Sequence, residues 1–230
     1  MVVDLSEISR HIDKLSADGC TQLLNVYHQI ITISAHHYDC DSCRFDSEGI
    51  SIRFLASDPH EAANACLDAI CASQLALRLI DRLNQARFER HLPTVRVSIG
   101  LSHGMGFASQ ITNTDTHYTA FLSTVESEAS RLAKLIQKGK VAITQSLADM
   151  ANAQQVVQLT PMHTQPMTDL YSEIRYATVT ALSPQLRKPI QLQADELFQA
   201  IYPRASLHTM EDIDAPEFGF DIDKKGTTPA

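Results

Sequence analysis

Hydrophobic positions in the first half of the chain switch between a helical and an alternating period. Apolar residues recur every three or four positions in two long segments, which predicts helices near 19–36 and 60–85. Between these helices, residues 43–46 and 50–55 alternate in polarity and are separated by a polar turn with a glycine. This pattern predicts a β-hairpin between the two helices.

Two further segments read as strands, residues 2–5 and, most clearly, residues 95–101. The predicted order is therefore strand, helix, hairpin, helix, strand. This order is typical of ferredoxin-like (βαββαβ) α+β folds, in which helices cover one face of an antiparallel sheet.

The pattern is less regular after residue 101. A polar loop at 109–117 leads to a helix expected near 121–137, which Gly139 ends as a C-cap. A strand at 141–144 and a short helix near Leu147 follow. These elements extend the predicted sheet beyond the βαββαβ unit.

The C-terminal part is predicted to hold strands within 155–182, a small helix at 190–202 and an acidic segment from residue 210 onward. We therefore divide the chain into one domain over 1–182, followed by a C-terminal helix and flexible tail over 183–230.

Composition narrows the class of protein. The chain has 230 residues, 44% of them hydrophobic, which is enough to form a core. Its net charge of −8 argues against a general nucleic-acid binder. The sequence pattern predicts no membrane span, and five cysteines without a secretory signal are typical of reduced thiols in the cytoplasm.

Two carboxylates are candidate metal ligands. Asp4 ends the first predicted strand, and Glu48 lies at the tip of the predicted hairpin. If the first strand neighbours that hairpin, the two side chains converge, and Mg²⁺ prefers such hard oxygen ligands together with substrate phosphate. The alternative is that Glu48 is a solvated turn residue and Asp4 a helix cap.

Four motifs, in order and spacing, resemble the class III nucleotide cyclase domain, the adenylate and guanylate cyclase homology domain, over about residues 2–150. They are Val3-Asp4-Leu5, Arg44-Phe45-Asp46-Ser47-Glu48-Gly49, Val97-Ser98-Ile99-Gly100-Leu101-Ser102-His103-Gly104, and Ala129-Ser130-Arg131-Leu132 with Gly139 and Val141-Ala142-Ile143-Thr144 after it. The resemblance implies a ferredoxin-like core with a cyclase-type extension.

The resemblance also implies roles for individual residues. Asp4 and Glu48 would bind Mg²⁺ or Mn²⁺, and Arg131 would be the catalytic arginine that stabilises the transferring phosphoryl group. Arg44 stands at the base-reading position, and Ser127 at the position that orients the ribose. Members of this family act on nucleoside triphosphates as dimers, with each site completed by two chains, so a homodimer is expected.

Several positions depart from the family pattern. Glu48 replaces an aspartate, Arg44 replaces a lysine, and Ser127 stands where an asparagine is expected, or Glu126 if one residue is inserted. Neither residue near the purine-reading position, 119 or 120, is an acid. These departures predict a signalling domain with weak or no turnover.

Two alternatives stay open. One is an active adenylate or guanylate cyclase that forms a cyclic nucleotide from ATP or GTP. The other is a degenerate GGDEF-like domain, because the segment from Arg44 to Glu48 also resembles that family's hairpin and Val97-Ser98-Ile99-Gly100 fits it too. The abrupt start at the first strand is typical of a fragment of a larger sensor, whose missing part could hold a membrane region.

His36, His37, Cys40 and Cys43 form a second, smaller constellation. Imidazole and thiolate groups at this spacing could bind Zn²⁺. A single Cys-x-x-Cys without a second pair is equally compatible with half-buried residues next to the hairpin.

Overall fold

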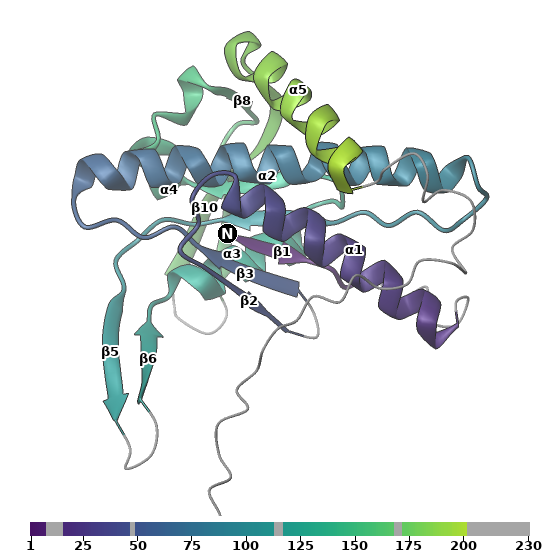
Figure 1. The fold of residues 1–230 in the computed structure, drawn as a ribbon. Coiled ribbons are helices and arrows are strands. Elements are labelled where there is room, and N and C mark those ends of the chain that lie inside the picture. The colour runs from purple at the N-terminus through teal and green to yellow at the C-terminus, as the bar shows by residue number, and fades with distance from the viewer. Residues whose placement is uncertain (8–15, 47–48, 113–116, 168–171, 202–230) are drawn as a thin grey trace, which may run out of the picture.

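The computed structural model describes residues 1–7, 16–46, 49–112, 117–167 and 172–201. The first six elements follow the predicted order of strand, helix, hairpin, helix and strand (Figure 1). They are β1 (Val2–Asp4), α1 (Ala17–His36), β2 (Ser42–Phe45), β3 (Gly49–Arg53), α2 (Pro59–Phe88) and β4 (Ser98–Leu101).

These strands belong to one twisted sheet with the order β2-β3-β1-β4-β7-β10-β8, and β9 pairs with β10. The later strands are β7 (Val141–Thr144), β8 (Val157–Leu159), β9 (His163–Met167) and β10 (Ser172–Leu182). Every pair is antiparallel except β4 with β7. The antiparallel-dominated α+β fold is therefore confirmed.

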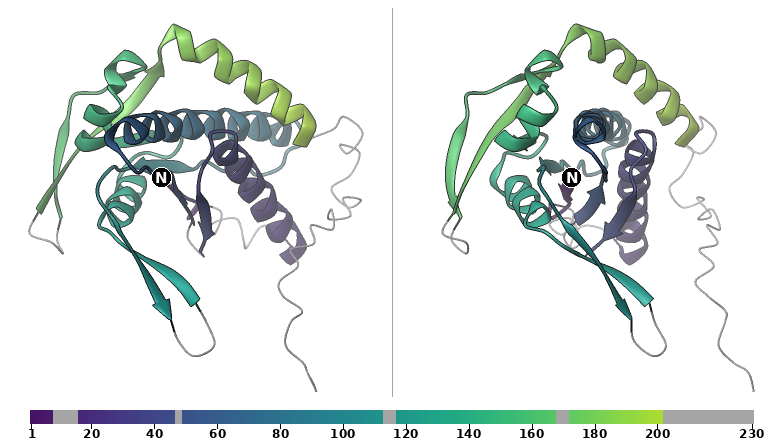
Figure 2. Two further views of the ribbon diagram at one scale, coloured as in Figure 1. Left: turned by 60° about the vertical axis from the view of Figure 1, so that its left-hand side comes forward. Right: turned by 90° about the vertical axis from the view of Figure 1, so that its left-hand side faces the viewer.

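Helices α1 and α2 cover one face of the sheet, as predicted (Figure 2). Ser16 caps α1 by accepting a hydrogen bond from Gly19, and Asp58 caps α2 in the same way, directly before Pro59. Their apolar stripes meet the sheet in the main core, which includes Tyr27, fully buried. Helix α2 is long and apolar enough to cross a membrane, but 56% of its most apolar window is buried inside this fold.

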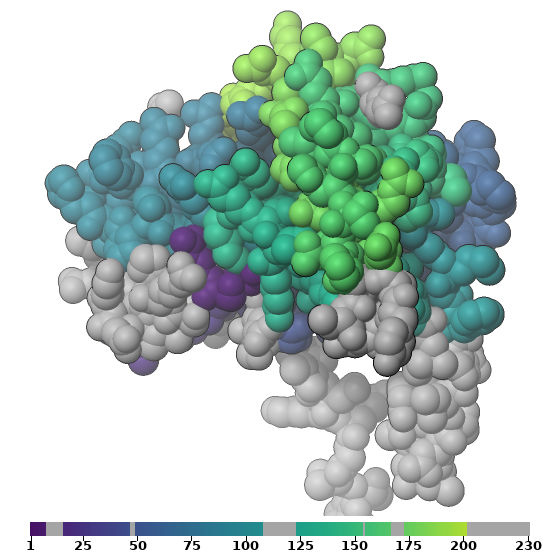
Figure 3. All heavy atoms as spheres, turned by 180° about the vertical axis from the view of Figure 1, so that it is seen from behind, coloured from purple at the N-terminus to yellow at the C-terminus, as the bar shows by residue number. Residues whose placement is uncertain are grey.

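Helix α3 (Val125–Leu135) packs on the opposite face, across β4. Gly100 makes this close approach possible, because a Cβ there would lie 1.9 Å from the carbonyl oxygen of Ala129. A small second core forms beneath α3 from Leu132, Ala142 and Ile174. The teal and green segments of the chain cover this side of the molecule in Figure 3.

One segment differs from the prediction. Residues 109–112 and 117, expected in a loop, belong to the antiparallel strands β5 (Phe107–Thr112) and β6 (His117–Leu122), and α3 begins only at residue 125 rather than near 121. The hairpin forms a two-stranded sheet of its own and extends away from the body (Figures 1 and 2). The β5–β6 hairpin does not join the main sheet. Its sequence therefore need not alternate between apolar and polar residues, as the sequence of a half-buried strand does.

The C-terminal part contains α4 (Gln145–Met150), a 3-10 turn (Ala153–Gln155) and α5 (Pro184–Ile201). Helix α5 is longer than the helix predicted at 190–202 and packs along α2. The predicted acidic tail from residue 210 onward lies outside the described residues, and the boundary at residue 182 stays a prediction.

Candidate functional site

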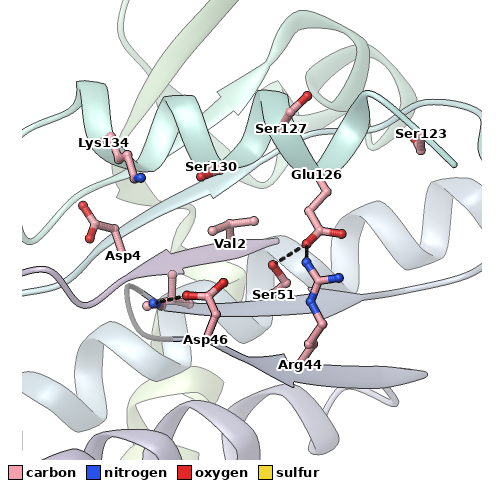
Figure 4. A pocket seen from close by; sticks show the side chains of 12 residues that line it. Val2, Asp4, Arg44, Asp46, Ser51, Ser123, Glu126, Ser127, Ser130 and Lys134 are labelled. Atoms are coloured by element: carbon pink, nitrogen blue, oxygen red, sulfur yellow. Dashed lines mark hydrogen bonds and ion pairs between the residues drawn. The ribbon is translucent and has the colours of Figure 1, made fainter. Parts of the chain in front are cut away.

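A cleft of about 400 Å³ opens between α3 and the edge formed by β1, β2 and β3 (Figure 4). Three carboxylates among the described residues line it, together with two cations and four serines. The polar lining residues are Asp4, Asp46, Glu126, Arg44, Lys134, Ser51, Ser123, Ser127 and Ser130. The cleft lies where the predicted site residues Asp4, Arg44 and Ser127 come together.

Asp4 lies at the end of β1, and its side chain is only 4% exposed. The Nζ atom of Lys138 donates to its Oδ2 at 2.5 Å, and the backbone N–H of Ser6 donates to its Oδ1 at 2.8 Å. Burial alone would raise the pKa of this carboxyl, but the hydrogen bonds from Lys138 and Ser6 and the charge of Lys138 outweigh it and lower the pKa. Asp4 is therefore an ionised carboxylate that is paired with the ammonium of Lys138.

Lys138 also forms hydrogen bonds with residues other than Asp4. Its ammonium also donates to Ser98 Oγ at 3.3 Å and to Ser6 Oγ at 3.2 Å. These three acceptors match the three donors of a lysine ammonium. Lys138 belongs to the segment between α3 and β7, which is anchored where Gly139 donates to the carbonyl of Val97 at 2.6 Å.

The hairpin between β2 and β3 contributes a second carboxylate, Asp46. Its Oδ1 accepts the backbone N–H of Gly49 at 2.8 Å, which closes the turn. Gly49 pairs with Asp4 in the β1–β3 ladder, and a Cβ at Gly49 would lie 2.2 Å from the carbonyl oxygen of Val3. The glycine thus brings the hairpin against β1, as the predicted convergence of carboxylates requires. Glu48 itself lies outside the described residues.

Glu126 forms the centre of a charge cluster at the other end of the cleft (Figure 4). Its carboxylate pairs with Arg44, lies 3.0 Å from Arg53 Nη2 and accepts a hydrogen bond from Ser51 Oγ at 2.8 Å. Burial would raise the pKa of Glu126, but Ser51 and the two guanidinium groups outweigh it and lower the pKa. Arg44, the predicted base-reading residue, forms an ion pair with Glu126, although its side chain is 61% exposed.

One face of α3 lines the cleft through Ser127, Ser130 and Lys134, which recur at helical spacing, and Ser123 lines it from just before the helix. Ser127 thus lies where a nucleotide-binding residue was predicted, although its hydroxyl donates to the carbonyl of Thr124. Arg131, the predicted catalytic arginine, is not among the residues that line this cleft. It is half-buried on α3, one position beyond Ser130.

Sequence reasoning missed Lys138, Asp46, Ser51 and Arg53 as site residues. Helix α3 ends at Leu135 with Ile136 as its C-cap, so Gly139 is not the C-cap that the sequence predicted, and a lysine in the segment after the helix gives no local signal of a partner 134 positions away. Asp46 had a signal, because an aspartate three residues before a glycine is typical of a hairpin turn, but the resemblance had drawn attention to Glu48. Glu126, which stands at the asparagine position if one residue is inserted, is paired with two arginines.

The described residues do not fit a divalent ion at Asp4 in this arrangement. Both carboxylate oxygens already accept hydrogen bonds, one of them from an ammonium. A second cation at that oxygen would meet Lys138 at close range, where like charges repel strongly. Asp46 has one oxygen committed to Gly49.

The βαββαβ core, the α3 helix and the cleft at the β1 edge define a nucleotide cyclase-like domain. The sequence matches the family described as the adenylate and guanylate cyclase catalytic domain over residues 4–169, and the chain belongs to this family. A search among curated proteins found no significant match.

Solved structures of cyclase domains share the fold. The adenylyl cyclase CyaB from P. aeruginosa is 14% identical, with a TM-score of 0.69 over 80% of this chain and 93% of that one. The guanylyl cyclase Cya2 is 18% identical, with a TM-score of 0.66 over 80% and 91% of the two chains. A bacterial light-regulated adenylyl cyclase is 19% identical, with a TM-score of 0.58 over 87% of this chain and 55% of that one.

Proposed function

We propose that this chain is a degenerate class III cyclase domain that signals as a homodimer in the cytoplasm, with weak or no turnover of nucleoside triphosphate. The observation that carries this proposal is the ion pair between Lys138 and Asp4. In the family reaction, the carboxylate at this position would hold a divalent ion, which would supply activation of the attacking hydroxyl and binding of phosphate. The ammonium of Lys138 neutralises the charge of Asp4, but it cannot coordinate phosphate oxygens as a metal ion does.

The cluster around Glu126 supports the same proposal from the other end of the cleft. Arg44 would have to leave Glu126 before it could contact a base, and Glu126 would then face the nucleotide with one fewer cation. Both changes oppose binding of a polyanionic substrate. The cleft is therefore stabilised by its own charges in the state without nucleotide.

Dimerisation is supported by large apolar side chains that are exposed at the base of the β5–β6 hairpin. Phe107 at the base of the β5–β6 hairpin is 69% exposed, and Met105 just before it is 85% exposed. Large apolar side chains exposed together are typical of interaction surfaces. One related structure is described as a dimeric guanylyl cyclase domain. Arg131 would reach a substrate only if a second chain placed it opposite Asp4.

The proposal is tested by incubating the protein with ATP or GTP and Mn²⁺ and separating the products by chromatography. We expect at most a small fraction of the cyclic nucleotide that a competent cyclase forms in the same buffer. Formation at a rate comparable to that of the competent cyclase, abolished by Arg131→Ala, would contradict the proposal. Sedimentation of the same samples measures the dimer separately.

An active cyclase is the second candidate, because Asp4 and Asp46 line one cleft and offer two carboxylates at adjacent strand ends. Activity would require Mn²⁺ or Mg²⁺ to displace Lys138 from Asp4 when the nucleotide enters. The product assay distinguishes the two candidates directly.

A further inference from the structure

A cluster of metal-ligating side chains lies away from the cleft, where α1 ends and the chain turns into β2. The ligand atoms of His36, Cys40 and Cys43 all lie within 4.8 Å of one another. Cys40 Sγ lies 3.5 Å from His36 Nδ1 and 3.7 Å from Cys43 Sγ. We propose that these three side chains form a Zn²⁺ site.

The two measured distances are those of a tetrahedral zinc site. With Zn–S bonds of about 2.3 Å and Zn–N bonds of about 2.0–2.1 Å, a tetrahedral angle separates two sulfurs by about 3.8 Å and a sulfur from a nitrogen by about 3.5–3.6 Å. The observed separations of 3.7 and 3.5 Å agree with these values to within about 0.1 Å. The third pair, His36 and Cys43, lies within 4.8 Å, so a small movement of these two side chains would bring all three ligands onto one ion.

The backbone turn after α1 builds this geometry. Asp39 adopts a left-handed conformation, with φ of 52°, and Cys40 N–H donates back to the carbonyl of Ala35 at 3.2 Å. This turn places Cys40 over His36 in the last helical turn. Cys43 follows on β2, where it pairs with Ile52 in the hairpin ladder. The ligands thus come from the helix end, the turn and the strand.

Two of the three candidate ligands are shielded from solvent: Cys40 is buried and Cys43 is half-buried, while His36 is exposed. Binding of Zn²⁺ converts both thiols to thiolates, and the two protons pass to solvent.

The zinc would join α1 to β2, the strand at the outer edge of the main sheet. An edge strand has a partner on one side only, so a metal crosslink at its start adds support that the sheet does not provide. Three protein ligands leave the fourth position for water. The proposed zinc site shares no residue with the cleft, and the zinc proposal does not depend on the proposed function.

The test is zinc binding by the full chain. Protein purified with a reductant and freed of metal by a chelator is titrated with Zn²⁺ against a competing chromophoric chelator. It is also titrated with Co²⁺, whose absorption reports thiolate ligands and four-coordination. We expect one equivalent of tightly bound Zn²⁺, and Co²⁺ spectra with thiolate charge-transfer bands.

Cys40→Ser, Cys43→Ser and His36→Ala should each weaken Zn²⁺ binding by more than about 100-fold, beyond the 10–100-fold that follows loss of an outer-shell partner. Cys20→Ser is the matched control, because Cys20 is a partly exposed free cysteine on α1 outside the cluster, and it should leave binding unchanged. Circular dichroism checks that each variant folds.

Three results would overturn the proposal. The first is that folded wild-type protein binds no zinc more tightly than Cys43→Ser does. The second is that zinc binds but all three cluster variants retain it. The third is that Cys40 and Cys43 are joined by a disulfide in protein from the reducing interior of cells, which thiol counting and mass spectrometry would detect.

Discussion

The ammonium of Lys138 lies 2.5 Å from the Asp4 carboxylate, which is almost fully buried at the end of β1. The pair joins the first strand to the segment after α3, 134 positions later. Lys138 therefore supplies a positive charge at Asp4, the carboxylate that the resemblance to cyclases identifies as a metal ligand.

Lys138→Met should destabilise the protein by roughly 3 kcal/mol, at the lower end of the cost of breaking a buried ion pair because Lys138 is 24% exposed. The substitution keeps the length of the side chain but leaves the Asp4 carboxylate buried without its partner. Urea unfolding measures the change. Lys140→Met, an exposed lysine in the same segment, is the control and should change stability by less than about 0.5 kcal/mol. Equal losses in the two variants would refute the role of the pair.

The stabilisation should depend on pH in a defined direction. The pKa of Asp4 in the folded protein is lowered, so its contribution is fully present above the unfolded value of about 3.9 and is lost as pH falls through the folded pKa. The difference in unfolding free energy between wild type and Lys138→Met should therefore be largest near neutral pH and shrink as pH falls and Asp4 becomes protonated in the two folded proteins. A difference that persists unchanged at pH 3 would be inconsistent with this account.

Glu126→Gln should increase the affinity of the cleft for nucleoside triphosphate about fivefold, since the charge of a partly exposed ion pair contributes about 1 kcal/mol. The change frees Arg44 and Arg53 from the carboxylate while keeping the shape of the side chain. Titration with a fluorescent ATP analogue measures it. Glu128→Gln is the control, because Glu128 lies on the same helix but accepts a hydrogen bond from Ser102 instead. An equal gain in both variants would show only a general charge effect.

Gly100→Ala should destabilise the fold by more than about 3 kcal/mol, beyond the usual cost of overpacking. The added Cβ would lie 1.9 Å from a backbone oxygen of α3, which cannot rotate away as a side chain can. At Gly104 the nearest atom to such a Cβ is a side-chain methyl of Val125, at 2.8 Å, so Gly104→Ala should cost less. Thermal unfolding compares the two variants. A milder effect at Gly100 than at Gly104 would contradict the packing described for α3.

The sequence predicted the βαββαβ order because each of those elements buries an apolar face, and burial imposes a period on the residues. It did not predict the β5–β6 hairpin, whose strands pair only with each other. In the site, Asp4 and the neighbouring hairpin were predicted from strand order and family resemblance. The sequence did not predict that Lys138 pairs with Asp4 or that Glu126 pairs with Arg44. The partners in each pair are distant in sequence, and their contacts depend on where α3 packs.

The central claim is that Lys138 takes the place of a metal ion at Asp4. Electron paramagnetic resonance of free Mn²⁺ tests it most directly, with wild type, Lys138→Met, and the double variant Asp4→Asn with Lys138→Met titrated under identical conditions without nucleotide. We expect that Lys138→Met gains one Mn²⁺ site that the double variant lacks, and that wild type binds no Mn²⁺ that depends on Asp4. Tight binding of Mn²⁺ by wild type that Asp4→Asn abolishes would contradict the claim.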